Sequence, residues 1–266
     1  MGSVESGRIV VGVDGSAHAA AALAWAVSTA SRGGAVVEPV AVWRSGPPWP
    51  WRRTTEAQVE AAAAVDPAVV VRYSERTGSA GPALVRAAEH ADLLVLGRHT
   101  GDPGSAGAVV HHCARYATCP VVVVGEVVPP PVGPLVVGVD GSPLSLAALD
   151  WALAEADRRG TELHVVTTRP AGQDTADLTD AVAERCAEHP EVPVRRERHT
   201  GSPGVDLVSA ARTADLLVVG SHGAGGLLSA LLGSVSDHCL RNASCPVAVI
   251  PAAMADGGAP RRLPTL

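Results

Sequence analysis

The sequence has 266 residues, of which 47% are hydrophobic, and a formal net charge of −6. This length suits one large domain or two ordinary ones, and the acidic balance argues against a nucleic-acid-binding protein, which needs a basic surface to neutralise phosphates. The chain contains no lysine, which excludes a GxxxxGK[ST] phosphate-binding loop and Schiff-base chemistry.

The chain repeats itself. The segment IVVGVDGSAHAAAALAWAV at residues 9–27 returns as LVVGVDGSPLSLAALDWAL at 135–153, an offset of 126 residues. The segment TGSAGPALVRAAEHADLLVLG at 77–97 returns at 200–220 with an offset of 123, and the offset is 126 again at the two CPV triplets. The offset returns to 126 inside one loop, which is three residues longer in the second copy, and the pattern indicates a tandem duplication.

The repeat predicts the domain organisation. We expect a first domain at 1–127 and a second at 135–252. Prolines and missing amide donors in VVPPPVGP favour an extended linker at 128–134. The residues at 253–266 follow no period and are expected to form a flexible tail.

Strands and helices alternate along each copy. In the second copy, apolar runs bounded by Gly, Asp or Pro predict strands at 134–140, 162–168, 193–199, 215–220 and 246–250. Helical periodicity predicts helices at 142–160, 175–189, 204–214 and 234–242. Ser142 is the expected N-cap of the first of these helices, Pro143 its first turn and Gly160 its end. Five strands alternating with helices predict a doubly wound, five-stranded parallel α/β sheet in each copy.

Two loops of the second copy are candidates for a ligand site. VGVDGS follows the first strand, and GSHGAGGLLSALLGSVSDH at 220–238 follows the fourth. Ligands of such sheets bind where the strand order reverses, so a strand order of 3-2-1-4-5 would place both loops beside the site. Glycines allow close backbone approach and positive φ, and the first amides of a helix beginning at Gly233-Ser234 favour an anion.

A purely structural interpretation of this loop stays open. Residues 234–237 also fit a capping box, which would explain Ser234 and Asp237 without a ligand. The Asp-Gly-Ser turn at Asp140 is likewise common where a chain enters a helix.

Each copy resembles the universal stress protein family over almost its whole length, as a tandem two-domain member. The resemblance is carried by VVGVDGS and by DLLVVGSHGAGGLLSALLGSVSDHCLRNASCPVAVI at 215–250, which contains the G-x2-G-x9-G-[ST] spacing of the ATP-binding branch. It implies an α/β nucleotide-binding fold, ATP bound without a lysine loop, and regulation rather than catalysis. Whether ATP, AMP or cyclic AMP is the physiological ligand, and whether Mg accompanies it, stays open.

The resemblance also implies a set of nucleotide contacts in the second copy. The adenine and ribose would be contacted by Gly138, Val139, Asp140 and Val166. The ribose and phosphates would be approached by Gly220, His222 and Gly223. The phosphate tail would be held by Gly233, Ser234, Val235 and Ser236. No catalytic residue and no metal ligand is expected.

The first copy departs from this pattern. Gly97 and Gly107 match, but Thr100 stands at the second glycine and Ala108 at the serine, and the spacer is three residues shorter. Arg98 would either compensate for these losses, by donating two hydrogen bonds from its guanidinium to a phosphate, or be solvated. We therefore expect one working site, in the second copy, and a weakened or lost site in the first.

Other residues indicate partners rather than chemistry. HHC at 111–113 fits a surface helix better than a metal site, and the matching positions of His112 and His238 indicate a shared role in the fold. The Trp- and Arg-rich segment at 42–53 is either an insertion that packs its own tryptophans or a surface for an unknown protein partner. Because the family pairs through its apolar last strand, the resemblance implies an intramolecular pseudo-dimer of the two copies and a homodimer of the chain.

The preferred function is an ATP-binding, non-enzymatic stress-response regulator or sensor. A dimerising binding module that uses no nucleotide and a weak ATPase are the alternatives. The longest apolar runs are too short to cross a bilayer, and no export signal is recognisable, so we expect a cytoplasmic protein without membrane contact.

Overall fold

The computed structural model describes residues 7–44, 49–98, 107–126, 132–168, 176–223 and 232–255. The chain divides into two compact units, the first within residues 1–128 and the second within 129–258. Most of the expected linker and tail, Thr100 and the middle of the 220–238 loop lie outside the described residues. The described start of the expected tail takes part in a short 3-10 helix, η2 (Ala252–Met254).

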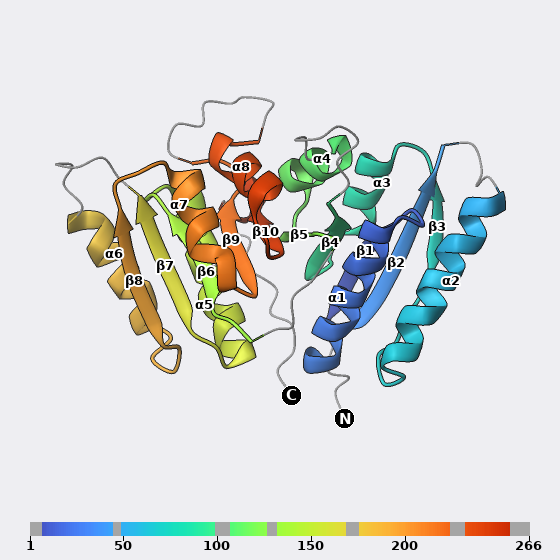
Figure 1. The fold of residues 1–266 in the computed structure, drawn as a ribbon, viewed down its shortest axis with the longest axis horizontal. Helices are drawn as coiled ribbons and strands as arrows, with labels where there is room; N and C mark the ends of the chain where they lie inside the picture. The colour runs from blue at the N-terminus through green and yellow to red at the C-terminus, as the bar shows by residue number, and fades with distance from the viewer. Residues whose placement is uncertain are drawn as a thin grey trace. The chain divides into compact units, whose positions relative to one another are not determined.

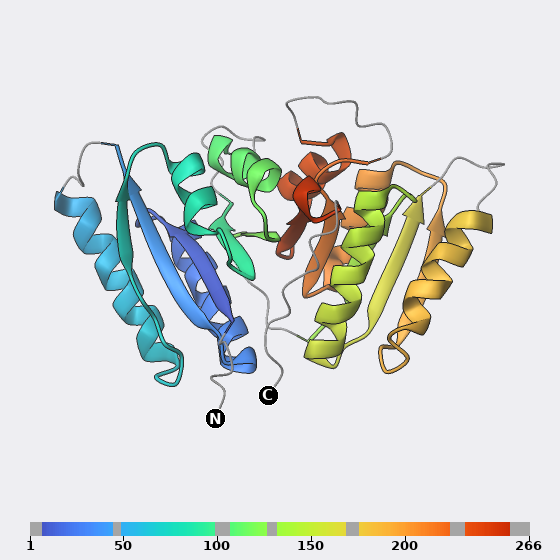
Figure 2. The ribbon, with the colours of Figure 1, turned by 180° about the vertical axis from the view of Figure 1, so that it is seen from behind.

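The first unit is a five-stranded parallel sheet with helices on both faces. Its strands are β1 (Arg8–Val13), β2 (Val36–Trp43), β3 (Ser74–Thr77), β4 (Leu93–Gly97) and β5 (Val121–Val124), in the order β3-β2-β1-β4-β5. Its helices are α1 (Ala17–Gly33), α2 (Trp49–Val65), α3 (Ala80–Ala87) and α4 (Ala108–Tyr116). Helices α1 and α2 pack together on one face, and α3 and α4 on the other (Figures 1 and 2).

The second unit has the same architecture. Its strands are β6 (Leu135–Val139), β7 (Leu163–Thr168), β8 (Val194–His199), β9 (Leu216–Gly220) and β10 (Val247–Ile250), in the order β8-β7-β6-β9-β10. Its helices are α5 (Pro143–Arg159), α6 (Ala176–Ala187), α7 (Pro203–Ala210) and α8 (Ser234–Asn242), with a 3-10 turn η1 (Ala211–Thr213) after α7. The doubly wound α/β fold expected from the sequence is confirmed.

The strand order resolves the question that the sequence left open. Within the second unit it corresponds to 3-2-1-4-5, so β6 lies between β7 and β9, and Leu135 pairs with both Leu163 and Leu216. The order reverses between β6 and β9, and the two candidate loops follow these two strands. They therefore lie beside each other at the carboxyl edge of the sheet.

Local sequence signals explain the helix ends. Ser142 caps α5, and its hydroxyl accepts a hydrogen bond from the amide of Ser145 at 3.2 Å. Pro143 occupies the first turn, and Gly160 ends the helix with a left-handed φ of 62°. The helix expected at 204–214 is instead divided into α7 and η1.

The central strands form the core of each unit. Val10, Val11, Val136 and Val137 have no exposed surface, as expected for parallel strands that helices cover on both faces. None of the described helices combines the length and apolar character that a membrane span requires.

Candidate functional site

The turn between β6 and α5 holds Asp140 in place. Gly141 has a φ of 88°, which favours glycine, and the amide of Ser142 donates to Asp140 Oδ1 at 2.9 Å. Ser145 Oγ accepts hydrogen bonds from the amides of Asp140 and Gly141, at 3.2 and 3.1 Å. One carboxylate oxygen of Asp140 therefore stabilises the turn through a hydrogen bond, as the structural interpretation predicts.

The described glycines of the second loop are required by close packing rather than by positive φ. A Cβ on Gly220 would lie 3.0 Å from Leu144 Cγ, and one on Gly223 would collide with Asp140 Oδ2. Gly233 has a φ of −61°, and a Cβ there would lie 2.9 Å from the Cα of His222. The expectation of positive φ is therefore wrong for these three glycines. Their small size permits these close contacts.

The start of α8 does not form the capping box that the sequence suggested. The N-cap is Gly233 and Ser234 is the first helical residue, so Ser234 cannot cap the helix with its side chain. Asp237 forms an ion pair with Arg241 one turn later instead. The same holds in the first unit, where Gly107 is the N-cap of α4. Having alanine at 108, where the second unit has Ser234, therefore does not cost α4 its N-cap.

Ser236 has a structural role that the sequence did not reveal. It is 2% exposed, and its hydroxyl donates to the carbonyl oxygens of Ser221 at 3.1 Å and Gly233 at 2.8 Å. The amide of Gly233 also donates to Ser221 O at 2.8 Å. These bonds tie the end of β9 to the start of α8. Within the described residues, the Ser234 hydroxyl has no such hydrogen bond.

The first amides of α8 remain outside the helix ladder. The first hydrogen bond of the ladder runs from the amide of Asp237 to Gly233 O, at 2.9 Å. The amides of Ser234, Val235 and Ser236 precede it and have no acceptor within the helix. Three N–H groups at the positive end of a helix dipole favour an anion.

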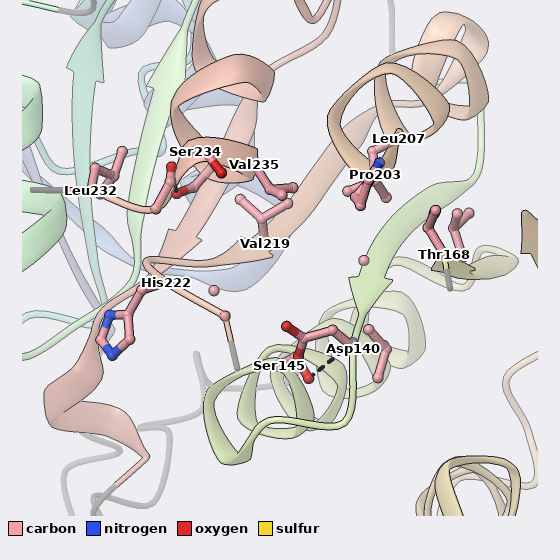
Figure 3. Close-up of a pocket in the computed structure, with 17 residues that line it drawn as sticks. Asp140, Ser145, Thr168, Pro203, Leu207, Val219, His222, Leu232, Ser234 and Val235 are labelled. Carbon is pink, nitrogen blue, oxygen red and sulfur yellow. Dashed lines mark hydrogen bonds between the residues drawn. The ribbon is translucent and has the colours of Figure 1, made fainter. Parts of the chain in front are cut away.

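All eleven residues expected to contact a nucleotide line one cavity of about 510 Å³ in the second unit (Figure 3). They are Gly138, Val139, Asp140, Val166, Gly220, His222, Gly223, Gly233, Ser234, Val235 and Ser236. The cavity size falls within the range of small-molecule sites. Their role in binding stays a prediction.

Six further lining residues were not predicted from the sequence. They are Ser145, Thr168, Pro203, Leu207, Val219 and Leu232. Thr168 ends β7, two residues after Val166. Because alternate side chains of a strand lie on the same face of the sheet, Thr168 could have been predicted from Val166. Leu207 faces Gly138, where a Cβ would lie 2.8 Å from Leu207 Cδ1, and this contact depends on how α7 packs.

The lining combines apolar and polar side chains. Val139, Val166, Val219 and Leu207 offer a slot for a flat apolar group, whereas Asp140 and Ser234 offer hydrogen-bonding groups. Among the described lining residues there is no arginine. His222 is exposed, and its imidazole points away from Asp140 (Figure 3). An anion here would depend on backbone amides.

The first unit contains a corresponding but smaller cavity of about 320 Å³. Asp14, Gly97 and Gly107 line it, at the positions that match Asp140, Gly220 and Gly233. Arg98 is not among its described lining residues, so the structure does not favour a guanidinium–phosphate contact there.

His112 and His238 have the same packing role in the two units. His112 and His238 pack against glycines of the neighbouring helix, where a Cβ on Gly81 or Gly204 would lie 2.8 or 2.9 Å from the imidazole ring. This shared fold role is confirmed. Among the described residues, HHC belongs to no cluster of three metal-type ligands; the one such group is Asp157, His189 and Glu191, which no sequence pattern predicted.

Comparisons with known proteins show the family of the chain. The universal stress protein family model matches residues 5–125 and 132–251. A universal stress protein of Mycobacterium tuberculosis is 42% identical over 156 residues, 51% of this chain and 52% of the relative. A universal stress protein of Mycolicibacterium smegmatis is 36% identical over 132 residues, 44% of this chain and 45% of the relative. The chain thus spans about half the length of these curated relatives.

A solved structure shares the fold of the whole chain. The universal stress protein from Archaeoglobus fulgidus DSM 4304 superposes with a TM-score of 0.73 at 20% identity, covering 93% of this chain and 99% of that one. Another solved structure, of a universal stress protein in complex with cAMP, is 29% identical over 45% of this chain and 96% of its own, with a TM-score of 0.40.

Proposed function

Since the chain belongs to the universal stress protein family in both of its halves, we propose that its second unit binds ATP and that the chain acts as a nucleotide-responsive regulator or sensor in a stress response. The observation that carries this proposal is the meeting of three features around one cavity. These are the G-x2-G-x9-G-[ST] loop, Asp140 and the unpaired amides at the start of α8.

Each part of the nucleotide has a matching surface. The adenine fits the slot between Val139, Val166 and Leu207, which offers apolar contacts. The ribose hydroxyls donate to the Asp140 carboxylate, which lines the cavity. The phosphates lie against the amides of 234–236 and the Ser234 hydroxyl, which replaces the missing lysine with backbone dipoles.

We also propose that the second unit binds ATP without turning it over. Among the described lining residues, Asp140 is the only carboxylate, and its Oδ1 already accepts from Ser142. The measurement is phosphate release at high protein concentration. Release that is proportional to protein and is lost in a loop variant would establish a weak ATPase instead. The homodimer and the protein partner stay predictions.

Titration calorimetry with ATP tests the binding proposal. We expect one site per chain, and a loss of at least about a hundredfold in affinity for Gly233→Asp, because a carboxylate at the phosphate end repels the ligand. The matched control is Gly107→Asp in the first unit, which should leave the isotherm unchanged. Absence of heat with the wild type, or an unchanged isotherm for Gly233→Asp, would contradict the proposal and favour a nucleotide-independent module.

A further inference from the structure

The cavity of the first unit differs chemically from its counterpart. Four polar lining residues of the second unit, Ser145, Thr168, Ser234 and Ser236, correspond to Ala19, Val42, Ala108 and Val110 in the first. Each of the four pairs is related by the repeat offset of 126. Every one of these changes replaces a hydroxyl with an apolar group.

A fifth change has the same direction. Thr168 donates to Asp206 Oδ2 at 3.5 Å in the second unit. With the offset of 123 that applies there, Asp206 corresponds to Ala83 in the first unit. The first unit therefore lacks this polar pair. Together the changes leave fewer polar side chains at the cavity of the first unit and beside it.

Apolar side chains form most of the wall of this cavity. Val40 and Ala19 are buried, Leu84 is 4% exposed and Leu96 is 4% exposed. Asp14 is the only ionisable side chain among the described lining residues, and its Oδ1 accepts from the amide of Ser16 at 3.0 Å. Among the described lining residues, a phosphate would meet the Asp14 carboxylate and no cation, and Ala108, the first residue of α4, has no hydroxyl. The volume of about 320 Å³ still lies within the range of small-molecule sites.

We infer that the cavity of the first unit is a binding site for a small, neutral, largely apolar molecule, separate from the nucleotide site proposed for the second unit. The apolar wall supplies affinity through burial of the ligand's surface. The first amides of α4, which follow Gly107, can donate to one polar atom of the ligand. The inference concerns the other unit and stands whether or not ATP binds.

The neutral fluorescent probe N-phenyl-1-naphthylamine tests this inference on the full chain. We expect saturable enhancement of its fluorescence at one site per chain, undiminished by excess ATP. Val42→Phe, which fills the end of the cavity, should weaken probe binding at least about tenfold, because it occupies space that the probe needs. The matched variant Thr168→Phe, at the same position of the second unit, should leave probe binding unchanged.

A milder variant covers the case in which Val42→Phe disturbs folding. Val42→Thr introduces the residue found at this position of the second unit, and threonine has nearly the same shape as valine. Its hydroxyl should weaken binding of the probe by roughly threefold or more. Circular dichroism and the thermal midpoint identify variants that remain folded. Failure of the wild type to bind the probe, displacement of the probe by ATP, or unchanged binding in folded Val42→Phe and Val42→Thr would each overturn the inference. ATP calorimetry on Val42→Phe is expected to match the wild type.

Discussion

A buried charge cluster lies on α5 of the second unit. The side chains of Glu155, Arg158 and Arg159 are only 6–7% exposed. Arg158 Nε donates to Glu155 Oε2 at 2.9 Å, and Arg159 Nε donates to Oε1 at 2.6 Å. Burial raises the pKa of Glu155, but the Arg159 and Arg158 guanidiniums outweigh it, and the pKa lies below its usual range. The carboxylate therefore neutralises cations that have little water around them.

Glu155→Gln should destabilise the chain by about 3 kcal/mol at neutral pH, because it removes the carboxylate that pairs with two buried guanidiniums. The folded pKa of Glu155 lies below the unfolded one. Its stabilisation is therefore fully present above the ordinary value of 4.5 and is lost as the pH falls through the folded pKa. Urea unfolding of both proteins as a function of pH checks this: the difference between them should shrink on acidification below 4.5.

The repeat supplies a control for this prediction. Thr29 occupies the corresponding position in the first unit, is fully buried, and its hydroxyl has no hydrogen-bond partner within the described residues. Thr29→Val removes an unsatisfied polar atom and keeps the shape, so it should not lower stability at any pH. A loss in Thr29→Val equal to that in Glu155→Gln, or a pH-independent loss in Glu155→Gln, would contradict the role given to the charge cluster.

At the scale of elements, α8 begins with two serines that have different roles. Ser236 ties the helix to β9, whereas Ser234 faces the cavity. Ser236→Ala should therefore destabilise the chain by about 1 kcal/mol, because the hydrogen bonds of its hydroxyl to Ser221 O and Gly233 O are lost, although both oxygens keep an amide donor. Ser234→Ala should leave the stability of the chain unchanged. It should weaken ATP binding by roughly tenfold, because the hydrogen bond from the Ser234 hydroxyl to a charged phosphate is lost. Thermal unfolding without ligand and calorimetry with ATP separate the two effects. Equal loss of stability in both variants would contradict this division.

The sequence predicted the elements well and the contacts between them less well. The helix boundaries at Ser142 and Gly160 follow from capping chemistry, which acts between neighbours in sequence. The packing of Leu207 against Gly138, and the hydrogen bonds from Ser236 to the end of β9, join residues far apart in sequence. No local pattern encodes such contacts. This is why the capping box was expected at Ser234 although Gly233 caps the helix.

At the scale of the molecule, the two units retain the same fold determinants and differ in their cavities. The glycine–histidine contacts Gly81–His112 and Gly204–His238 are the same in both, and so are the Asp-Gly-Ser turns. The differences among the cavity-lining side chains changed the chemistry of the site without changing the sheet. Duplication thus left one fold with two chemically distinct pockets.

The cysteines of the two units give a test of how closed these folds are. Cys113 and Cys119 match Cys239 and Cys245, and all four are buried. Burial raises the pKa of Cys113, of Cys119 and of Cys239 to about 12, so few of these thiols are ionised at pH 8.

Cys186, on α6, is partly exposed and has no counterpart in the first unit. A thiol reagent such as 5,5′-dithiobis(2-nitrobenzoate) at pH 8 should therefore react rapidly with one thiol of the native chain, and with all five after denaturation. Cys186→Ser should remove the rapid phase, whereas Cys119→Ser should leave it intact. Rapid reaction of further thiols would show that a unit opens on the timescale of labelling, since only opening exposes its matched pair of buried cysteines.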